Sequence, residues 1–334
     1  MSAAGAAAAR GGRTSVRFGV ELPHRPELLA PAALRAEALG FDSVWIGDHV
    51  AIHRPTLDPL AALSYLAGLT RRVRIGPCVY LLALRHPTLT AKAVASLDVL
   101  SGGRVVFGVG VGGEFPKEFE ACGVPHRERG ARVDEGIAVC RALWGPSPVS
   151  FAGRFTQFTD VVAEPRPVQP GGPPIWIGGR SDAALRRAAR VGDGWIAYLV
   201  TPERFRTSLE KIQTFAREIG RPLDPETFEP AHVFFTVVDD DREAARATAA
   251  RYLEAQYNQP FDDLARKYCL LGPPAACAER LAEFVAAGVR TFVIYFAVPP
   301  ARVLEQLERF GAEVRALAPD ESGPSRAVAG PWRT

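Results

Sequence analysis

The sequence predicts a (β/α)8 TIM barrel, an α/β fold in which eight parallel strands, each followed by a helix, close into a cylinder. Three observations predict it. Short apolar runs alternate with longer helical patterns eight times along the chain. The runs are apolar at consecutive positions, as strands are when helices cover the outside and side chains fill the interior. The chain has 334 residues, 47% of them hydrophobic, which suffices for one barrel with a large core.

The first half of the chain contains four predicted strand–helix pairs. Pro59 and Pro87 stand at the start of two helical patterns, where proline suits the first turn. Gly102 and Gly103 are typical of a helix end followed by a strand start. The predicted pairs are Val16–Leu22 with Glu27–Leu39, Ser43–Gly47 with Pro59–Leu69, Val73–Tyr80 with Pro87–Leu100, and Arg104–Val109 with Arg129–Trp144.

The second half repeats the alternation with four further pairs. A β-branched or aromatic run comes first each time, and a longer pattern with helical spacing follows it. The predicted pairs are Ile175–Gly178 with Asp182–Val191, Gly194–Ala197 with Pro202–Ile219, Val233–Val238 with Arg242–Gln256, and Thr291–Phe296 with Arg302–Leu317.

Two long connections interrupt this rhythm, and we expect them as loop insertions at the C-terminal face of the barrel, where long loops cap the active site. One, Gly145–Pro174, contains a predicted hairpin of Val149–Phe151 and Arg154–Phe158 around Gly153. The other, Tyr257–Ala282, contains a further predicted helix. Three aromatic residues of this second connection either line an apolar substrate pocket or pack the loop onto the barrel: Tyr257, Phe261 and Tyr268.

Composition narrows the class of protein. The 40 Lys+Arg and 37 Asp+Glu residues leave a formal charge of +3, which argues against a nucleic-acid-binding protein. No apolar run approaches the roughly 20 residues that span a bilayer. The five cysteines contain no Cys-x-x-Cys pair, so we expect a cytoplasmic protein without disulfides. Disordered tails are expected at residues 1–15 and 319–334, on either side of a barrel domain at residues 16–318.

Polar residues follow the second predicted strand, and in a barrel such positions face the catalytic mouth. They are Asp48 and His49. Histidine can give or take a proton near neutral pH, and a nearby carboxylate can tune it. The alternative is a structural histidine. His53 lies four residues on, but two histidines without a third ligand are weak grounds for a metal site, and we predict none.

The fourth predicted strand ends in the glycine-rich run Gly108–Gly113, followed by Glu114. The run satisfies the G-x-G-x-x-G pattern of dinucleotide-binding folds. However, it follows the fourth strand rather than the first, and Pro116 comes where a pyrophosphate-binding helix should start. We therefore interpret the run as backbone that glycine opens to the close approach of a flat ring. Glu114 is then a candidate acid/base residue at the mouth.

The fifth predicted strand ends in Gly178 and Gly179, and Arg180 and Ser181 lead directly into a helix. Free N–H groups and the helix dipole make such a turn a ready anion site. Arg180 would add a charge partner for a phosphate group. The alternative is an ordinary tight turn in which Ser181 caps the helix.

Taken in order, several segments resemble the luciferase-like monooxygenase family, in particular its branch of oxidoreductases that depend on the deazaflavin F420. The resemblance covers about residues 16–315 and rests on the ordered set rather than on one motif. The segments are Leu39–Trp45 with Asp48 and His49, Arg85–Pro87, Leu97–Gly103, Gly108–Gly113, Phe119 with Glu120, Gly123–Pro125, Pro173–Gly179 and Gly192–Trp195.

The resemblance implies a barrel that binds F420 or FMN at its mouth. It implies that Asp48 and His49 lie beside the ring of the cofactor. It also implies a bulge with a non-prolyl cis peptide behind the ring, at Cys78 and Val79. Glycines of this chain match the two cofactor loops of the family: Gly110, Gly112 and Gly113 after the fourth strand, and Gly178 and Gly179 after the fifth.

Two departures from the family pattern bear on the site. Some deazaflavin dehydrogenases carry their glutamate nearer the strand-four glycines, where this chain has Gly113, so Glu114 is displaced by one position. The segment from His49 to Leu57 is shorter than in many members, and a more open pocket is expected.

The leading hypothesis for function is hydride transfer between F420 and a small organic substrate, with His49 relaying a proton. The alternative is a two-component FMN-dependent monooxygenase that uses O2 and reduced flavin from a partner reductase. A third hypothesis is a non-catalytic flavin- or deazaflavin-binding protein, because fold alone does not establish function. A homodimer is expected, since members of the family are often dimers.

Overall fold

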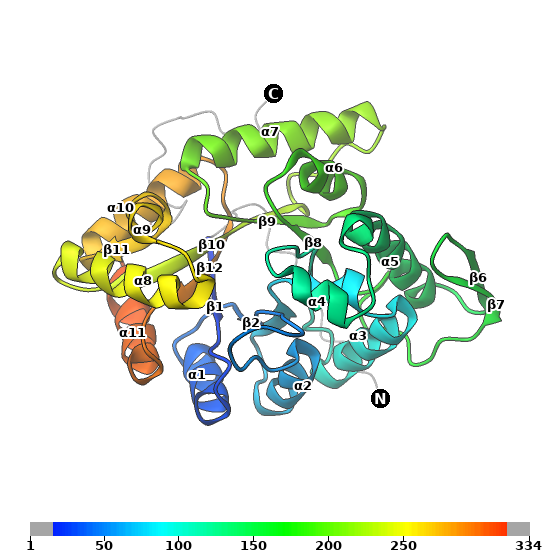
Figure 1. Cartoon of the computed structure of the whole chain (residues 1–334), viewed down its shortest axis with the longest axis horizontal. Helices are drawn as coiled ribbons and strands as arrows, with labels where there is room; N and C mark the ends of the chain where they lie inside the picture. Colours follow the sequence, from blue (N-terminus) through cyan, green and yellow to red (C-terminus); the bar gives the residue numbers. More distant parts are fainter. Residues whose placement is uncertain (1–15, 319–334) are drawn as a thin grey trace, which may run out of the picture.

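The computed structural model describes residues 16–318, so the predicted tails lie outside the described residues. Ten strands form one parallel sheet in the order β3-β2-β1-β12-β10-β9-β8-β5-β4, with β11 beside β10. Helices surround the strands (Figure 1). The strands are β1 Arg17–Glu21, β2 Ser43–Ile46, β3 Arg74–Pro77, β4 Tyr80–Leu81, β5 Phe107–Gly110, β8 Ile175–Gly178, β9 Gly194–Tyr198, β10 Glu229–Val238, β11 Leu270–Gly272 and β12 Thr291–Phe296.

Most helices come directly after a strand in the chain, and they lie on the outside of the sheet (Figure 1). Proline occupies the first turn of several of them, including α2 and α3, as expected. The α-helices are α1 Pro26–Ala38, α2 Pro59–Leu69, α3 Pro87–Ser101, α4 Pro116–Ala121, α5 Arg129–Trp144, α6 Asp182–Val191, α7 Pro202–Glu218, α8 Arg242–Tyr257, α9 Asp262–Tyr268, α10 Pro274–Ala286 and α11 Val303–Arg309.

The barrel closes between its third strand and β5. Ile75 accepts the backbone N–H of Val106 at 2.9 Å and donates its own to the carbonyl of Arg104 at 3.0 Å. β3 and β4 are two parts of that third strand, and β4 pairs with β5. The strand predicted as continuous is therefore interrupted, at the cis peptide between Cys78 and Val79. With β3 and β4 taken together, the eight-stranded barrel is confirmed.

The first insertion forms the predicted hairpin, but its second arm lies later in the chain. Its strands are β6 Val149–Ala152 and β7 Gln157–Val161. The predicted second arm began at Arg154. Glu135 of α5 instead accepts the backbone N–H groups of Arg154 and Phe155 at 2.7 and 2.9 Å, which holds these residues in the turn.

Other boundaries also differ from the sequence pattern. The second insertion contains α9, β11 and α10 rather than a single helix. β10 begins at Glu229 instead of Val233, because its first residues pair with β9, Glu229 opposite Gly194. The last predicted helix is α11, which ends at Arg309 and continues as a π-helical turn, Phe310–Val314.

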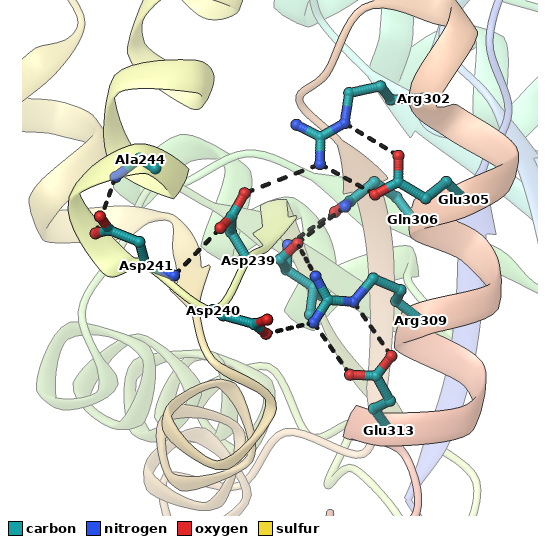
Figure 2. A network of polar contacts seen from close by, with 10 residues as sticks. Asp239, Asp240, Asp241, Ala244, Arg302, Glu305, Gln306, Arg309 and Glu313 are labelled. Carbon is teal, nitrogen blue, oxygen red and sulfur yellow. Dashed lines mark hydrogen bonds and ion pairs between the residues drawn. The ribbon is translucent and has the colours of Figure 1, made fainter.

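A polar network fastens α11 to the turn after β10 (Figure 2). The buried Gln306 amide accepts from the N–H of Val238 at 2.7 Å and donates to its carbonyl at 2.9 Å. Arg309 reaches Asp240 at 2.7 Å and Glu313 at 3.1 Å. The side chain of Gln306 thus satisfies the backbone of Val238 beyond the point where pairing with β12 ends, while β11 pairs with this end of β10.

The core is aromatic and continuous. Trp45, Trp195 and Phe107 are fully buried. Trp45 packs 5.3 Å from the ring of Trp176, and its indole N–H donates to Ser43 Oγ at 2.8 Å, so the buried polar atom is satisfied. Among residues 16–318, no helix is both long and apolar enough to cross a membrane.

Candidate active site

A cavity of about 320 Å³ lies where the parallel strands end. Its lining includes the last residue of several strands and the residues that follow them, as expected for a barrel enzyme. The principal lining residues are Glu21, His24, Gly47, Asp48, His49, Arg54, Cys78, Val79, Gly110, Gly112, Gly113, Glu114, Glu118, Arg129, Gly178, Gly179, Tyr198, Phe235, Gln256, Tyr257 and Tyr295.

Val79 forms an apolar projection on the cavity wall. The cis peptide predicted between Cys78 and Val79 is present. A Cβ at Gly110 would overlap the Cγ2 of Val79, and one at Gly178 would lie 2.9 Å from its Cγ1. The two glycines therefore leave room for Val79 from neighbouring strands, and this position cannot shift without changing the cavity wall.

His49 is oriented by a carboxylate from α4. Its Nδ1 lies 3.1 Å from Oε2 of Glu118. The other oxygen of Glu118 accepts the backbone N–H groups of Val50 and Ala51 at 2.6 and 3.2 Å. Burial raises the pKa of Glu118, but the hydrogen bonds from His49 and from these N–H groups outweigh it, and the net pKa lies below its usual value. An ionised Glu118 fixes the Nδ1–H tautomer, which leaves Nε2 of His49 for proton exchange in the cavity.

Asp48 also lines the cavity, but its carboxylate is fully engaged. It accepts from Arg85 Nη1 and Nη2 at 2.7 and 2.8 Å and from the backbone N–H of Leu81 at 2.8 Å. The guanidinium of Arg85 lies over the ring of Tyr80. Asp48 therefore holds the chain just after Val79, and its predicted contact with the cofactor would come through its backbone rather than through free carboxylate oxygens.

Glu114 follows the glycine run after β5 and reaches the end of β9. Its Oε1 accepts the hydroxyl proton of Tyr198 at 2.7 Å. Burial and the neighbouring charge of Glu114 raise the pKa of Tyr198 well above its usual value. Glu114 is thus placed where the sequence expected a mouth carboxylate, and its partner is Tyr198, which the sequence did not indicate.

Two buried nitrogen atoms near Gly113 have no acceptor among the described residues. They are Nε of Arg129 and Nε2 of His126, and a Cβ at Gly113 would lie 3.1 Å from each. Arg129 Nη1 lies 3.4 Å from Nδ1 of His126, which must accept, so Nε2 carries the proton. Two N–H donors without acceptors therefore converge on the glycine loop after β5, which favours an anion there.

The turn after β8 contributes its backbone rather than its side chains. Gly178 and Gly179 line the cavity, but Arg180 and Ser181 are not among the lining residues. Ser181 Oγ accepts the N–H of Ala184 at 3.3 Å and caps α6, as the alternative interpretation held. Arg180 donates to the carbonyl of Leu199 and stacks over Tyr198. The side chains of Arg180 and Ser181 therefore support the cavity wall without entering the cavity.

The end of β1 brings together ionisable side chains that sequence reasoning missed. Glu21, His24 and Arg54 all line the cavity. Burial raises the pKa of Glu21 to about 8, with Arg54 opposing the shift. Burial, then the charges of Arg54 and His49, lower the pKa of His24 to about 4. At neutral pH this corner therefore holds a largely protonated carboxyl, a neutral imidazole and a permanent cation.

The sequence pattern could have indicated only some of these residues as part of the site. Glu21 lies one residue before the end of the predicted strand Val16–Leu22, and a carboxylate near the end of a barrel strand is expected at the mouth. Glu118 lies on α4, in the segment between β5 and α5, and Arg129 is the first residue of α5; no local pattern marks either residue. Of the aromatic residues considered, Tyr257 lines the cavity, while Phe261 is buried beneath it and Tyr268 is not among the lining residues.

A metal site was not expected, and His53 contacts the ring of Phe115 and the carbonyl of Ala255. Among residues 16–318, no three His, Cys, Asp or Glu side chains are grouped as they would be around a metal ion.

Known proteins with similar sequences include named enzymes. The chain is 25% identical to 5,10-methylenetetrahydromethanopterin reductase of Methanopyrus kandleri, over 90% of this chain and 97% of that one. It is 32% identical to a phthiodiolone/phenolphthiodiolone dimycocerosates ketoreductase of Mycobacterium kansasii, over 66% of each chain. An uncharacterized protein of Mycobacterium tuberculosis is 33% identical over 57% of this chain and 72% of its own length.

Solved structures show the same fold. An F420-dependent secondary alcohol dehydrogenase in complex with an F420-acetone adduct superposes with a TM-score of 0.80 at 22% identity, over 91% of this chain and 99% of that one. The FMN-bound oxygenating constituent of 3,6-diketocamphane monooxygenase from Pseudomonas putida superposes with a TM-score of 0.74 at 18% identity, over 92% and 99%. The family profile of the luciferase-like monooxygenases matches residues 10–291, and the chain belongs to that family.

Proposed function

We propose that this protein is an oxidoreductase that transfers a hydride between F420 and a small organic substrate at the barrel mouth. The observation that carries the proposal is His49, whose Nδ1 is fixed by Glu118 and whose ring lines the same cavity as Val79. The likeness to F420-dependent enzymes of known structure supports it, as do the reductase and the ketoreductase among the relatives.

The residues of the cavity fit a flat ring with an anionic tail. Val79 presents an apolar face, and Gly110 and Gly178 beside it carry no side chain that would obstruct a ring. The unpaired donors of Arg129 and His126 near Gly113 would bind a phosphate group. Gly112 and Gly113, together with Gly178 and Gly179, would offer backbone N–H groups along the same wall.

The bound cofactor would supply the hydride chemistry, and the chain would supply orientation and a proton. When a carbonyl carbon gains a hydride, its oxygen needs a proton, and Nε2 of His49 is placed to hold that proton. In the reverse direction Nε2 would accept the proton of an alcohol. Glu118 keeps the imidazole in the required tautomer and stabilises its protonated form.

The second candidate is the FMN-dependent monooxygenase, with a partner reductase. The fold shared with the FMN-bound monooxygenase constituent favours it, and the same wall would serve either cofactor. Titration of the purified protein with F420 and with FMN, in both redox states, separates the two. Micromolar or tighter binding of F420 with weak binding of FMN supports hydride transfer. Preference for FMN, with oxygen consumption when reduced FMN and substrates are supplied, moves the case to the monooxygenase.

A variant at His49 tests the catalytic role. His49→Ala should reduce turnover far more than it reduces affinity for the cofactor, because Nε2 acts on the substrate. Equal losses of turnover and cofactor affinity would contradict the assigned role.

A further inference from the structure

A second chamber adjoins the cavity at the side of β1 and β12. It has a volume of about 150 Å³ and shares Glu21, His24, Arg54 and Tyr295 with the main cavity. The chamber therefore lies on the far side of the barrel mouth from the glycine loops after β5 and β8, because β1 and β12 lie across the sheet order from those strands. The remaining lining residues are Pro23, Arg25, Pro55, Tyr252, Phe296, Pro300 and Val303.

Two arginines in this chamber have no anionic partner. Among the described residues, neither Arg25 nor Arg54 forms an ion pair or a side-chain hydrogen bond, and the buried Nε of Arg54 has no acceptor. Many other arginines of the protein do form ion pairs, for example Arg85 with Asp48. Arg25 is exposed, so water can satisfy its guanidinium, whereas the buried Nε of Arg54 lies next to a cavity without an acceptor and favours an anionic ligand there.

The other groups of the chamber do not supply a compensating negative charge. Glu21 is its one carboxyl group among the described residues. Burial raises the pKa of Glu21 to about 8, so this carboxyl is largely protonated at neutral pH and can donate a hydrogen bond. His24 accepts the N–H of Leu57 through Nδ1 at 3.2 Å, so its neutral ring carries a proton on Nε2. The polar groups here are donors.

The walls of the chamber suit an apolar body behind the anionic group. Tyr252 and Tyr295 share a hydroxyl contact at 3.2 Å, and Tyr295 also donates to Gln256 at 2.8 Å. With these hydroxyls engaged, the rings of Tyr252, Tyr295 and Phe296 present mainly apolar surface.

We propose that this chamber binds an anionic group of the substrate, a carboxylate or a phosphate, through Arg54 with help from Arg25 and His24. The inference rests on the proposed function, because that function identifies the bound molecule as a substrate. It places the reacting carbon between the anionic group and Nε2 of His49, within the main cavity. A substrate that carries an acidic group on an apolar or aromatic body would satisfy both the arginines and the aromatic wall.

Three small probes test the proposal without knowledge of the substrate: phenylacetate, phenyl phosphate and the neutral phenylacetamide. Binding to the purified full chain is measured by ligand-observed NMR titration at pH 7. At least one of the two anions should bind about tenfold more tightly than the amide, because a charge-assisted hydrogen bond to a guanidinium is lost with the amide. The preferred anion identifies the carboxylate or the phosphate as the recognised group.

Variants locate the binding. Arg54→Gln should abolish the preference for the anion, and Arg54→Lys should keep part of it because the charge remains. Arg132→Gln on α5 is the matched control, since Arg132 pairs with Glu128 and lines neither cavity, and it should leave the preference intact. Arg129→Gln shows whether the probes bind instead at the proposed phosphate site near Gly113. Circular dichroism confirms that each variant is folded. Equal binding of anions and amide, a preference that survives in Arg54→Gln, or a preference lost only in Arg129→Gln would each overturn the proposal.

Cofactor titrations on the same variants keep this inference separate from the proposed function. Arg54→Gln should bind F420 and FMN as the wild type does. A loss of F420 affinity in this variant would assign Arg54 to the cofactor and overturn the inference. If neither cofactor binds the wild type, the proposed function fails, while Arg54-dependent binding of the anionic probes would still support the chamber as an anion site.

Discussion

Nδ1 of His49 lies 3.1 Å from Oε2 of Glu118, although the two residues are 69 positions apart in the chain. His49 follows β2, and Glu118 lies on α4 in the excursion after β5. The same carboxylate also holds the backbone N–H groups of Val50 and Ala51, so one side chain fixes both the loop after β2 and the tautomer of the imidazole. The catalytic proposal therefore depends on a residue outside the barrel strands.

Replacement of Glu118 tests that dependence. Glu118→Gln should lower kcat by roughly 10²-fold, because a neutral amide no longer enforces the Nδ1–H tautomer or stabilises the protonated ring. The dissociation constant for the cofactor should change little. Steady-state kinetics and cofactor titration measure the two effects. Glu120→Gln is a matched control, since Glu120 is exposed and pairs only with Lys117 at the surface. Normal kcat in Glu118→Gln would refute the orienting role.

Predictions from the sequence were correct where a local pattern determines the structure, and they were wrong where a contact with a distant residue determines it. The strands Ile175–Gly178 and Thr291–Phe296 were predicted with their observed bounds, because an apolar run between turn residues is visible in the chain itself. The second hairpin arm was placed wrongly, because the carboxylate of Glu135 on a different element holds Arg154 and Phe155 in the turn. Long-range hydrogen bonds of this kind leave no periodic pattern in the sequence.

The same distinction applies to the site. Asp48 and His49 could be predicted at the mouth because they directly follow a strand, although the pairing of Asp48 with Arg85 was not visible. Arg180 and Ser181 lie next to lining glycines, but their side chains are engaged elsewhere, by Leu199 and by the start of α6. Proximity in sequence predicts the region of a site better than it predicts which side chains enter the cavity.

Arg129 should distinguish cofactors with a phosphate from those without one. Arg129→Gln should weaken FMN binding by about tenfold while leaving riboflavin binding unchanged, because a charge-assisted hydrogen bond to phosphate is lost. If F420 is the cofactor, the same comparison uses F420 and its phosphate-free chromophore. Fluorescence titration measures all four affinities. Arg132→Gln on the same helix is the control, since Arg132 pairs with Glu128 and does not line the cavity. Parallel losses for FMN and riboflavin would argue against phosphate binding.

Ionisation of Glu21 should lower the stability of the folded protein as the pH rises into the alkaline range. Its folded-state pKa of about 8 lies above the usual 4.5, so folding favours the protonated form. The associated stability is present below pH 4.5 and is lost as the pH rises through 8. Glu21→Gln removes this titration and should be more stable than the wild type at pH 9, by on the order of 3 kcal/mol, with a smaller difference at pH 5. Urea unfolding at the two pH values measures the difference, and an unchanged difference would show that Glu21 ionises normally.

Protonation of His232 should lower the stability of the folded protein as the pH falls into the acid range. It is fully buried among Phe205, Phe234 and Phe284, and neither ring nitrogen has a partner among the described residues. Burial, with a smaller contribution from the charge of Arg280, lowers its pKa from 6.5 to about 3. The stability that comes from a neutral ring is present above pH 6.5 and is lost as the pH falls toward 3.

Substitution by an apolar residue removes both the unpaired nitrogens and the titration. His232→Leu should be more stable than the wild type by about 1–3 kcal/mol at pH 7. At pH 5 the difference should grow by about 2 kcal/mol, since only the wild type must keep a histidine neutral below its unfolded pKa. His53→Leu, at an exposed position, should change stability little at either pH. A destabilised His232→Leu at both pH values would mean that packing of the imidazole outweighs its polarity.

The contact between Gly110 and Val79 gives a direct test of the cavity wall. A Cβ at Gly110 would overlap the Cγ2 of Val79, so Gly110→Ala must push Val79 toward the cavity or distort β5. Overpacking of this kind destabilises by about 1–3 kcal/mol, which leaves a folded protein whose wall is altered where the ring is proposed to lie. Cofactor affinity should therefore fall by about tenfold or more, with a modest decrease in Tm.

The matched control is Gly68→Ala in α2, where no atom lies within 4 Å of the new Cβ and alanine favours the helix by up to about 1 kcal/mol. That variant should gain stability and bind the cofactor normally. Wild-type affinity in Gly110→Ala would show that the cofactor does not contact Val79, and the ring would then have to be placed elsewhere in the cavity.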